Sequence, residues 1–292
     1  MMNLFPWLQD SISSINFDFL PHAIILEGVN GIGKKELGEF ITLKILKTDT
    51  LNNHEQLVTQ LTHPDLMKIT DESIIKVDSI HSGIEFLNLS SVISKNRVLI
   101  IEDAEKMNKY SQNALLKTLE EPRDNSFLIL QSNQSKSLND TLYSRCRLIK
   151  IQLPNQVEKE KYLLSENIPA DKLGYLPSFM SPKKIAEIIN SEQINIYESL
   201  YKNLLSILQQ KDIHNSIQNV LKTQISFSEK LNFLIDFLKR YASSQMSLEK
   251  DKIDLMKFMN EIHEYRVKLF AIKSLNENYA LSYFLTELSK LK

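Results

Sequence analysis

Four short apolar runs mark the first half of the chain, at residues 22–27, 98–101, 127–130 and 148–151. The run at 98–101 is unbroken, too short for a helix and too uniformly apolar for a half-exposed strand. Such runs are typical of strands in parallel sheets, which are covered on both faces. The pattern therefore predicts buried strands at 22–27, 98–101 and 127–130 and another apolar strand at 148–151, and a further strand edge is predicted at 74–77 just before a helix start.

Segments with helical spacing alternate with these strands. Apolar residues three and four positions apart predict helices at 36–46, from 78 onward and at 113–120, and Pro122 ends the last of them. Alternating strands and helices favour an α/β domain in which helices cover both faces of a parallel sheet.

After Pro154 the strand patterns stop and only helical patterns follow. A short helix is predicted at 158–167, and Ser181 followed by Pro182 is a typical helix start, with serine as N-cap. Five longer helices are then predicted at 194–210, 213–224, 227–242, 248–274 and 279–291. We therefore predict an α/β domain at 1–154, a small helical domain at 155–195 and an all-helical association domain at 196–292.

Composition narrows the function classes. The 292 residues include 35 basic and 36 acidic side chains, giving a net charge of -1, so no overall basic field is present to hold nucleic acid. A contact with DNA would have to be local or shared with partners. No run of about 18 apolar residues predicts a membrane span, and the first residues lack the pattern of a signal peptide, so we expect a cytoplasmic protein.

The single cysteine, Cys146, leaves no partner for an internal disulfide and fits a reducing compartment. We expect it to be a buried structural residue. His54, His63 and His81 lack metal-ligand spacing, so we expect exposed or capping histidines and no zinc.

A glycine-rich stretch follows the first predicted strand and precedes a helix, which is the context of a phosphate-binding loop. Gly28, Gly33 and Lys34 complete the pattern GxxxxGK, and Gly31 adds a further glycine within it. Backbone N–H groups would face the phosphates and Lys34 would reach the β and γ groups. However, Lys35 stands where Ser or Thr would give a hydroxyl to Mg²⁺, and an ammonium group cannot ligate a metal.

Polar residues come directly after two of the predicted strands. Glu102 and Asp103 follow one strand and form a candidate acidic site, while Ser132 and Asn133 follow another and are candidate phosphate sensors. Because the carboxyl ends of parallel strands meet at one edge of a sheet, both pairs are expected at the same edge.

Two longer motifs carry a resemblance to a known family. The sequence NALLKTLEEP at 113–122, followed about two dozen residues later by Ser144-Arg145-Cys146, resembles the clamp-loader branch of the AAA+ ATPases. The stretch IIEDAEKM at 100–107 is more similar to the delta-prime family of bacterial DNA polymerase III subunits than to the gamma/tau motor subunits. The resemblance covers nearly all of residues 1–154.

The resemblance implies an AAA+ domain followed by a helical lid and a helical collar. It implies that Arg145 acts in trans, as a finger toward ATP held by a neighbouring subunit, and that Lys183 lies where the lid often carries a nucleotide sensor. Relative to the family, the acids Glu102 and Asp103 stand in reversed order. The implied partners are gamma/tau and delta subunits in a hetero-oligomeric ring, with the sliding clamp and primed DNA reached through the complex.

These departures favour a non-motor subunit of the polymerase holoenzyme, without an enzyme activity of its own and without a required cofactor. Weak binding of ATP or ADP without hydrolysis stays open beside a relic loop that binds nothing. Two other hypotheses are an active gamma/tau-type motor, disfavoured by Lys35, and a scaffold outside replication, which would leave Arg145 without a purpose.

Overall fold

The computed structural model describes residues 4–47, 54–71, 73–245, 255–265 and 277–290. The chain forms two compact units, one made of residues 1–162 with 181–184 and the other of 163–180 with 185–292. The predicted division at 154 and 195 stays a prediction.

The first unit contains a five-stranded parallel sheet with the order β2-β3-β4-β1-β5. Its strands are β1 (Ala23–Glu27), β2 (Leu66–Ile69), β3 (Arg97–Ile101), β4 (Ser126–Ser132) and β5 (Arg147–Lys150). The four predicted strands are confirmed within two residues at each end. The strand edge predicted at 74–77 is wrong, because only Ile75 forms an isolated bridge, with Met107, and the next helix already begins at Val77. The fifth strand, β2, was not among the predicted strands.

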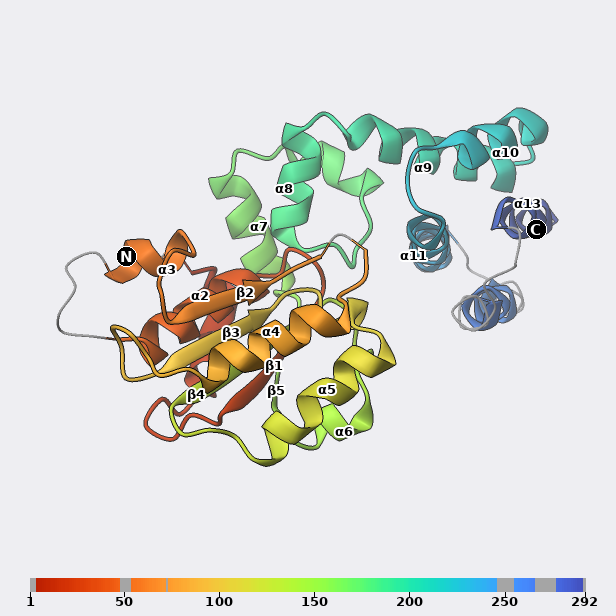
Figure 1. Ribbon diagram of the computed structural model, residues 1–292. Helices are drawn as coiled ribbons and strands as arrows, with labels where there is room; N and C mark the ends of the chain where they lie inside the picture. Colours follow the sequence, from red (N-terminus) through yellow and green to blue (C-terminus); the bar gives the residue numbers. More distant parts are fainter. Residues whose placement is uncertain (1–3, 48–53, 72, 246–254, 266–276, 291–292) are drawn as a thin grey trace. The chain divides into compact units, whose positions relative to one another are not determined.

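Helices cover both faces of this sheet (Figure 1). The first unit contains η1 (Pro6–Leu8), α1 (Gln9–Ser13), α2 (Lys34–Ile45), α3 (His54–Thr59), α4 (Val77–Asn88), η2 (Ala104–Lys106), α5 (Lys109–Glu120), α6 (Asp140–Tyr143) and most of α7 (Gln156–Ser165). Helix α5 begins four residues earlier than predicted because the Asn108 side chain caps it, accepting a hydrogen bond from the Ser111 N–H at 2.9 Å.

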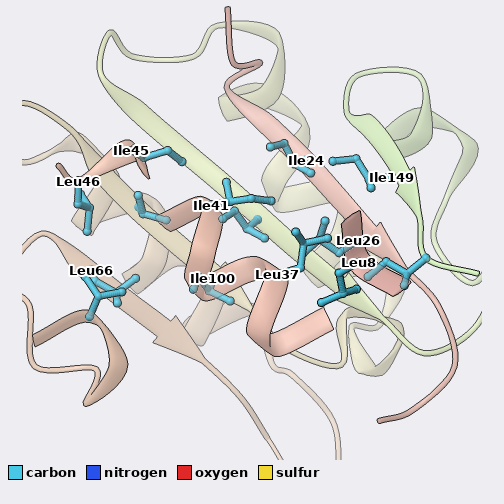
Figure 2. Packing of buried hydrophobic residues seen from close by; sticks show 14 of the residues in the cluster. Leu8, Ile24, Leu26, Leu37, Ile41, Ile45, Leu46, Leu66, Ile100 and Ile149 are labelled. Atoms are coloured by element: carbon cyan, nitrogen blue, oxygen red, sulfur yellow. The ribbon is translucent and has the colours of Figure 1, made fainter. Parts of the chain in front are cut away.

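Successive strand residues point to opposite faces and build two hydrophobic clusters. On one face, Leu37 and Ile41 of α2 belong to the same cluster as Ile24 and Leu26 of β1 (Figure 2). The intervening residue, Ile25, belongs to a second cluster that includes residues of α4, α5 and α6. Full burial on both faces explains why β1 and β3 have no polar alternation.

The second unit is helical throughout its described part. It contains η3 (Ala170–Tyr175), α8 (Pro182–Asn190, of which the first residues belong to the first unit), α9 (Ile194–Leu208), α10 (Ile213–Lys222), α11 (Phe227–Gln245), helical residues 255–265 and α13 (Glu277–Leu288). The helix predicted at 248–274 is seen at 255–265, and its remaining residues lie outside the described ranges. Among the described helices, none is long and apolar enough to cross a membrane.

A buried carboxylate stabilises the turn between α4 and β3. The side chain of Asp65 accepts hydrogen bonds from the backbone N–H groups of Val92, Ile93 and Ser94 at 2.6 to 2.9 Å. Its side chain is fully buried, and a guanidinium nitrogen of Arg97 lies 3.7 Å away. Burial alone would raise the pKa of Asp65, but these hydrogen bonds outweigh it and hold the pKa below its usual value.

We predict that Asp65→Ala lowers the free energy of unfolding by about 2 to 4 kcal/mol, because buried N–H groups lose their acceptor. Urea unfolding at pH 7 measures this, and the exposed Asp124→Ala is the control, with a change of at most about 0.5 kcal/mol. Since the folded pKa is the lower one, the wild-type advantage is present above about pH 4 and is lost as the pH falls through the folded pKa. An equal loss in both variants would contradict the prediction.

Candidate functional site

The glycine-rich loop at 28–33 connects β1 to α2 and has the backbone that a phosphate-binding loop requires. Gly31 and Gly33 have φ of 74° and 110°, a region that side chains rarely adopt. A Cβ atom on Gly31 would also lie 2.7 Å from the hydroxyl oxygen of Ser181. The local geometry therefore explains why glycine occupies these two positions.

Four carbonyl groups of this loop are occupied by donors from the chain itself. The Lys34 ammonium donates to the carbonyls of Gly28 and Val29 at 2.8 and 2.9 Å. The Ser181 hydroxyl donates to Asn30 at 2.9 Å, and the indole N–H of Trp7 donates to Ile32 at 2.7 Å. Trp7 is 7% exposed and belongs to the hydrophobic cluster that contains Ile24 and Leu26 of β1.

Lys34 is buried, with 7% of its surface exposed. Burial lowers the pKa of its ammonium to about 8, although the carboxylates of Glu105, Asp103 and Glu36 pull in the opposite direction. Its neighbour Lys35 is different, because its side chain is 58% exposed and lies 3.9 Å from Glu39 on the next helical turn.

The two acids of the candidate acidic site form ion pairs with different lysines. Glu102 forms an ion pair with Lys68 of β2 at 2.7 Å. Asp103 adopts a left-handed backbone with φ of 46° and pairs with Lys106 at 2.9 Å. The structure therefore does not bring the two carboxylates together on one partner.

Glu105, which the sequence motifs did not single out, accompanies Asp103 instead. The side-chain amide of Asn133 donates to Asp103 at 2.5 Å and to Glu105 at 2.8 Å, and its backbone N–H donates to Glu105 at 3.1 Å. Asn133 thus joins two carboxylates at the carboxyl end of the sheet. Only the fold could reveal Glu105, because its contacts with Asn133 span 28 residues.

The other two predicted sensors also have partners within the chain. The buried Ser132 hydroxyl donates to the Gln134 carbonyl at 2.9 Å and contacts the Ser137 hydroxyl at 2.9 Å. Lys183 forms an ion pair with Glu36, in the first turn of α2, at 2.7 Å. Lys183 therefore lies beside α2, the helix that follows the glycine-rich loop.

Arg145 lies on the surface in the turn after α6. One guanidinium nitrogen is 2.6 Å from Glu120 Oε1, at the end of α5. The other donates to the Thr141 carbonyl and the Ser144 hydroxyl, both at 3.2 Å. With 34% of the side chain exposed, the guanidinium is held by its neighbours but open to solvent.

The burial of Cys146 and His63 can be compared with what the sequence predicted for them. Cys146 is half-buried, and burial raises the pKa of its thiol to about 12, so the thiol is protonated and unreactive at neutral pH. His63 was expected to be exposed or capping. It is 2% exposed, and its Nδ1 accepts the Asp65 N–H at 3.1 Å, so it caps this turn. In the described part of the chain, no group of three His, Cys, Asp or Glu residues has a geometry suited to a metal ion.

A parallel sheet covered on both faces, with a strand, glycine-rich loop and helix at its carboxyl edge, defines an α/β domain of the P-loop class. Residues 7–155 match the family model described as "DNA polymerase III, delta subunit", and the chain belongs to this family. The resemblance predicted from the motifs at 100–122 and 144–146 is thereby confirmed.

Individual relatives agree with this assignment. The delta' subunit of DNA polymerase III from Haemophilus influenzae is 30% identical over 179 residues, covering 57% of this chain and 55% of that protein. The delta' subunit of Buchnera aphidicola subsp. Acyrthosiphon pisum is 27% identical, covering 89% and 85%. The gamma subunit of the same organism is 25% identical, covering 85% and 66%.

A solved structure of a gamma subunit-related protein from Thermotoga maritima is 17% identical and covers 94% of this chain and 96% of its own, with a TM-score of 0.49.

We predict that the buried Lys34 ammonium makes stability depend on pH in the alkaline range. Its folded pKa of about 8 lies below the unfolded value near 10.5, so the unfolded chain binds more protons between these values and wild-type stability rises with pH there. Lys34→Met should remove this rise, and the exposed Lys35→Met should keep it. Urea unfolding at pH 7.5 and pH 10 measures the difference, and equal slopes for wild type and Lys34→Met would contradict the prediction.

Proposed function

We propose that the protein is a non-motor subunit of a clamp-loader complex and that it presents Arg145 to ATP bound by a neighbouring subunit. The observation that carries this proposal is the Arg145 guanidinium, exposed to solvent yet oriented by Glu120 and the α6 turn. Membership of the DNA polymerase III delta family and relatives that include both delta' and gamma subunits support it.

The chemistry of arginine suits this role. A guanidinium group is always charged and presents a planar fork of donors, which matches the oxygens of a transferring phosphoryl group. A finger of this kind contributes on the order of 10³ to 10⁵ to the rate in GTPases. The alternative is a structural arginine that pairs with a carboxylate at a domain edge, and the ion pair between Arg145 and Glu120 fits both roles. The exposure of 34% of the Arg145 side chain favours the finger, because it leaves the guanidinium open to a neighbouring subunit.

The chain's own loop has features opposed to a motor role. Lys35 offers no hydroxyl for Mg²⁺, and its ammonium cannot ligate a metal. Asp103, one of the two acids that follow β3, forms an ion pair with Lys106 and accepts a hydrogen bond from Asn133. We therefore propose that this loop does not support hydrolysis and that any binding of ATP or ADP is weak. Neither zinc nor another cofactor is required under this proposal.

The wider setting follows from the same proposal. The subunit joins gamma/tau and delta subunits in a ring, through its helical C-terminal part, and helps place the sliding clamp on primed DNA in the cytoplasm. Its nearly neutral charge fits a protein whose DNA contacts are shared with its partners. It belongs to the DNA-directed DNA polymerase, a nucleotidyltransferase, only as a member of the complex.

We predict that Arg145→Ala slows ATP turnover in a reconstituted assembly with gamma/tau, delta, clamp and primed DNA. The ATP site that receives the finger should slow by on the order of 10³, so total turnover falls by the share of that site. Arg147→Ala is the matched control, because Arg147 is exposed two residues further along and should leave turnover unchanged. Gel filtration establishes that each variant still assembles. Full turnover with Arg145→Ala in an intact assembly would refute the trans role.

We also predict that the isolated chain hydrolyses no ATP above background, since its loop cannot place a metal beside the phosphates. Steady-state phosphate release measures this, and equilibrium binding of a fluorescent ATP analogue measures weak binding separately. If the isolated wild-type chain hydrolyses ATP and Lys34→Ala abolishes that activity, the protein is a motor of the gamma/tau type.

A further inference from the structure

Glu27, the last residue of β1, is a buried carboxylate with no part in the proposed finger chemistry. It is 4% exposed and directly precedes Gly28 of the loop. Moving a carboxylate out of water is strongly unfavourable unless donors surround it, so its neighbours indicate what it organises.

Those neighbours come from two segments that follow β4 and from β5. Glu27 accepts hydrogen bonds from the Ser135 hydroxyl at 2.9 Å, the Lys136 N–H at 3.2 Å and the Tyr143 hydroxyl at 2.9 Å. The Lys150 ammonium, at the end of β5, lies 3.7 Å away. The carboxylate therefore ties the end of β1 to the loop after β4 and to α6.

Tyr143 is the last residue of α6 and lies two residues before Arg145. A helix of four residues has no independent stability, so the position of α6 depends on tertiary contacts. Its beginning is held by the backbone N–H of Asn139, which donates to the side chain of Gln112 at 2.8 Å. Its end is held by the bond from Tyr143 to Glu27.

The Tyr143 hydroxyl remains a donor throughout the physiological pH range. Burial raises the pKa of the phenol, and the hydrogen bond to Glu27 raises it further. A neutral phenol donating to a buried carboxylate forms a charge-assisted bond, which is stronger than a bond between neutral groups.

We infer that Glu27 is a positioning residue for Arg145 and acts through Tyr143. The inference rests on the proposed function, because it assigns a second residue to the same trans finger. Glu27 and Gln112 hold the two ends of α6. The turn at 144–146, and with it the side chain of Arg145, is therefore held in one orientation on the domain surface. Without the bond from Tyr143, the guanidinium would sample orientations in which it cannot reach a neighbour's phosphate.

The test compares Tyr143→Phe with Ser135→Ala in the assembly used for Arg145. Each substitution removes one hydroxyl donor from the same carboxylate, but only Tyr143 belongs to α6. We expect Tyr143→Phe to slow the one ATP site that receives the finger by roughly threefold to tenfold, as for a lost hydrogen bond. The total kcat of the assembly should therefore fall, but by less than with Arg145→Ala, and KM should be unchanged. Ser135→Ala should leave both constants at wild-type values.

A double variant separates positioning from general damage. If Tyr143 acts through Arg145, then Tyr143→Phe should have no further effect on kcat in an Arg145→Ala background. Glu27→Gln, which keeps the size of the side chain but removes its charge, provides a second route to the same comparison. Thermal unfolding of each variant establishes that the chain is folded.

The outcomes distinguish this inference from the function on which it rests. An equal loss of kcat from Tyr143→Phe with and without Arg145 would show a purely structural role and overturn the inference. Wild-type kcat for folded Tyr143→Phe and Glu27→Gln, together with a loss for Arg145→Ala, would also overturn it and leave the proposed function standing. Wild-type kcat for Arg145→Ala would overturn both.

Discussion

Parallel pairing around β1 is the constraint on which the rest of the first unit depends. Strand β1 lies between β4 and β5, and Glu27 is in register with Ser132 of β4 and with Lys150 of β5. The three strands therefore end at the same level, and the chain segments that leave them emerge at one edge. The glycine-rich loop and Asn133 approach one another because their strands do. The turn at 144–146 instead precedes β5, whose first residue, Arg147, is in register with Ile24 of β1.

Bringing these strand ends together concentrates charge in a partly dry region, and the protein balances it with internal partners. Glu27 is neutralised by Lys150 and by hydroxyl and backbone donors, and Asp103 by Lys106. The Lys34 ammonium donates to two carbonyls of its own loop. Any nucleotide would have to replace several of these internal contacts, which reduces its net gain on binding.

The strands buried on both faces could be predicted from local pattern, because their apolar residues occupy every position. At the edges of the sheet the local pattern does not decide, because the missed strand β2 (LMKI) has the same pattern as the run LIKI at 148–151, which was predicted. Spacing located the glycine-rich loop and the family resemblance singled out Arg145, but the partners of each site residue lie far away in sequence. Glu27 contacts residues 108 to 116 positions away and Arg145 contacts Glu120 at a separation of 25. Such pairings depend on strand order, which periodicity does not encode.

The turn at 144–146, which carries Arg145, is held in place by a buried hydrogen bond, whereas the guanidinium itself forms an exposed ion pair. The bond between Tyr143 and the buried Glu27 is costly to break, because it would leave a carboxylate in a dry environment short of a donor. The ion pair between Arg145 and Glu120 is largely exposed, and pairs of this kind contribute less than about 1 kcal/mol. Under the proposed function, a neighbour's phosphate therefore needs little free energy to displace Glu120, while the buried bond keeps the turn in place.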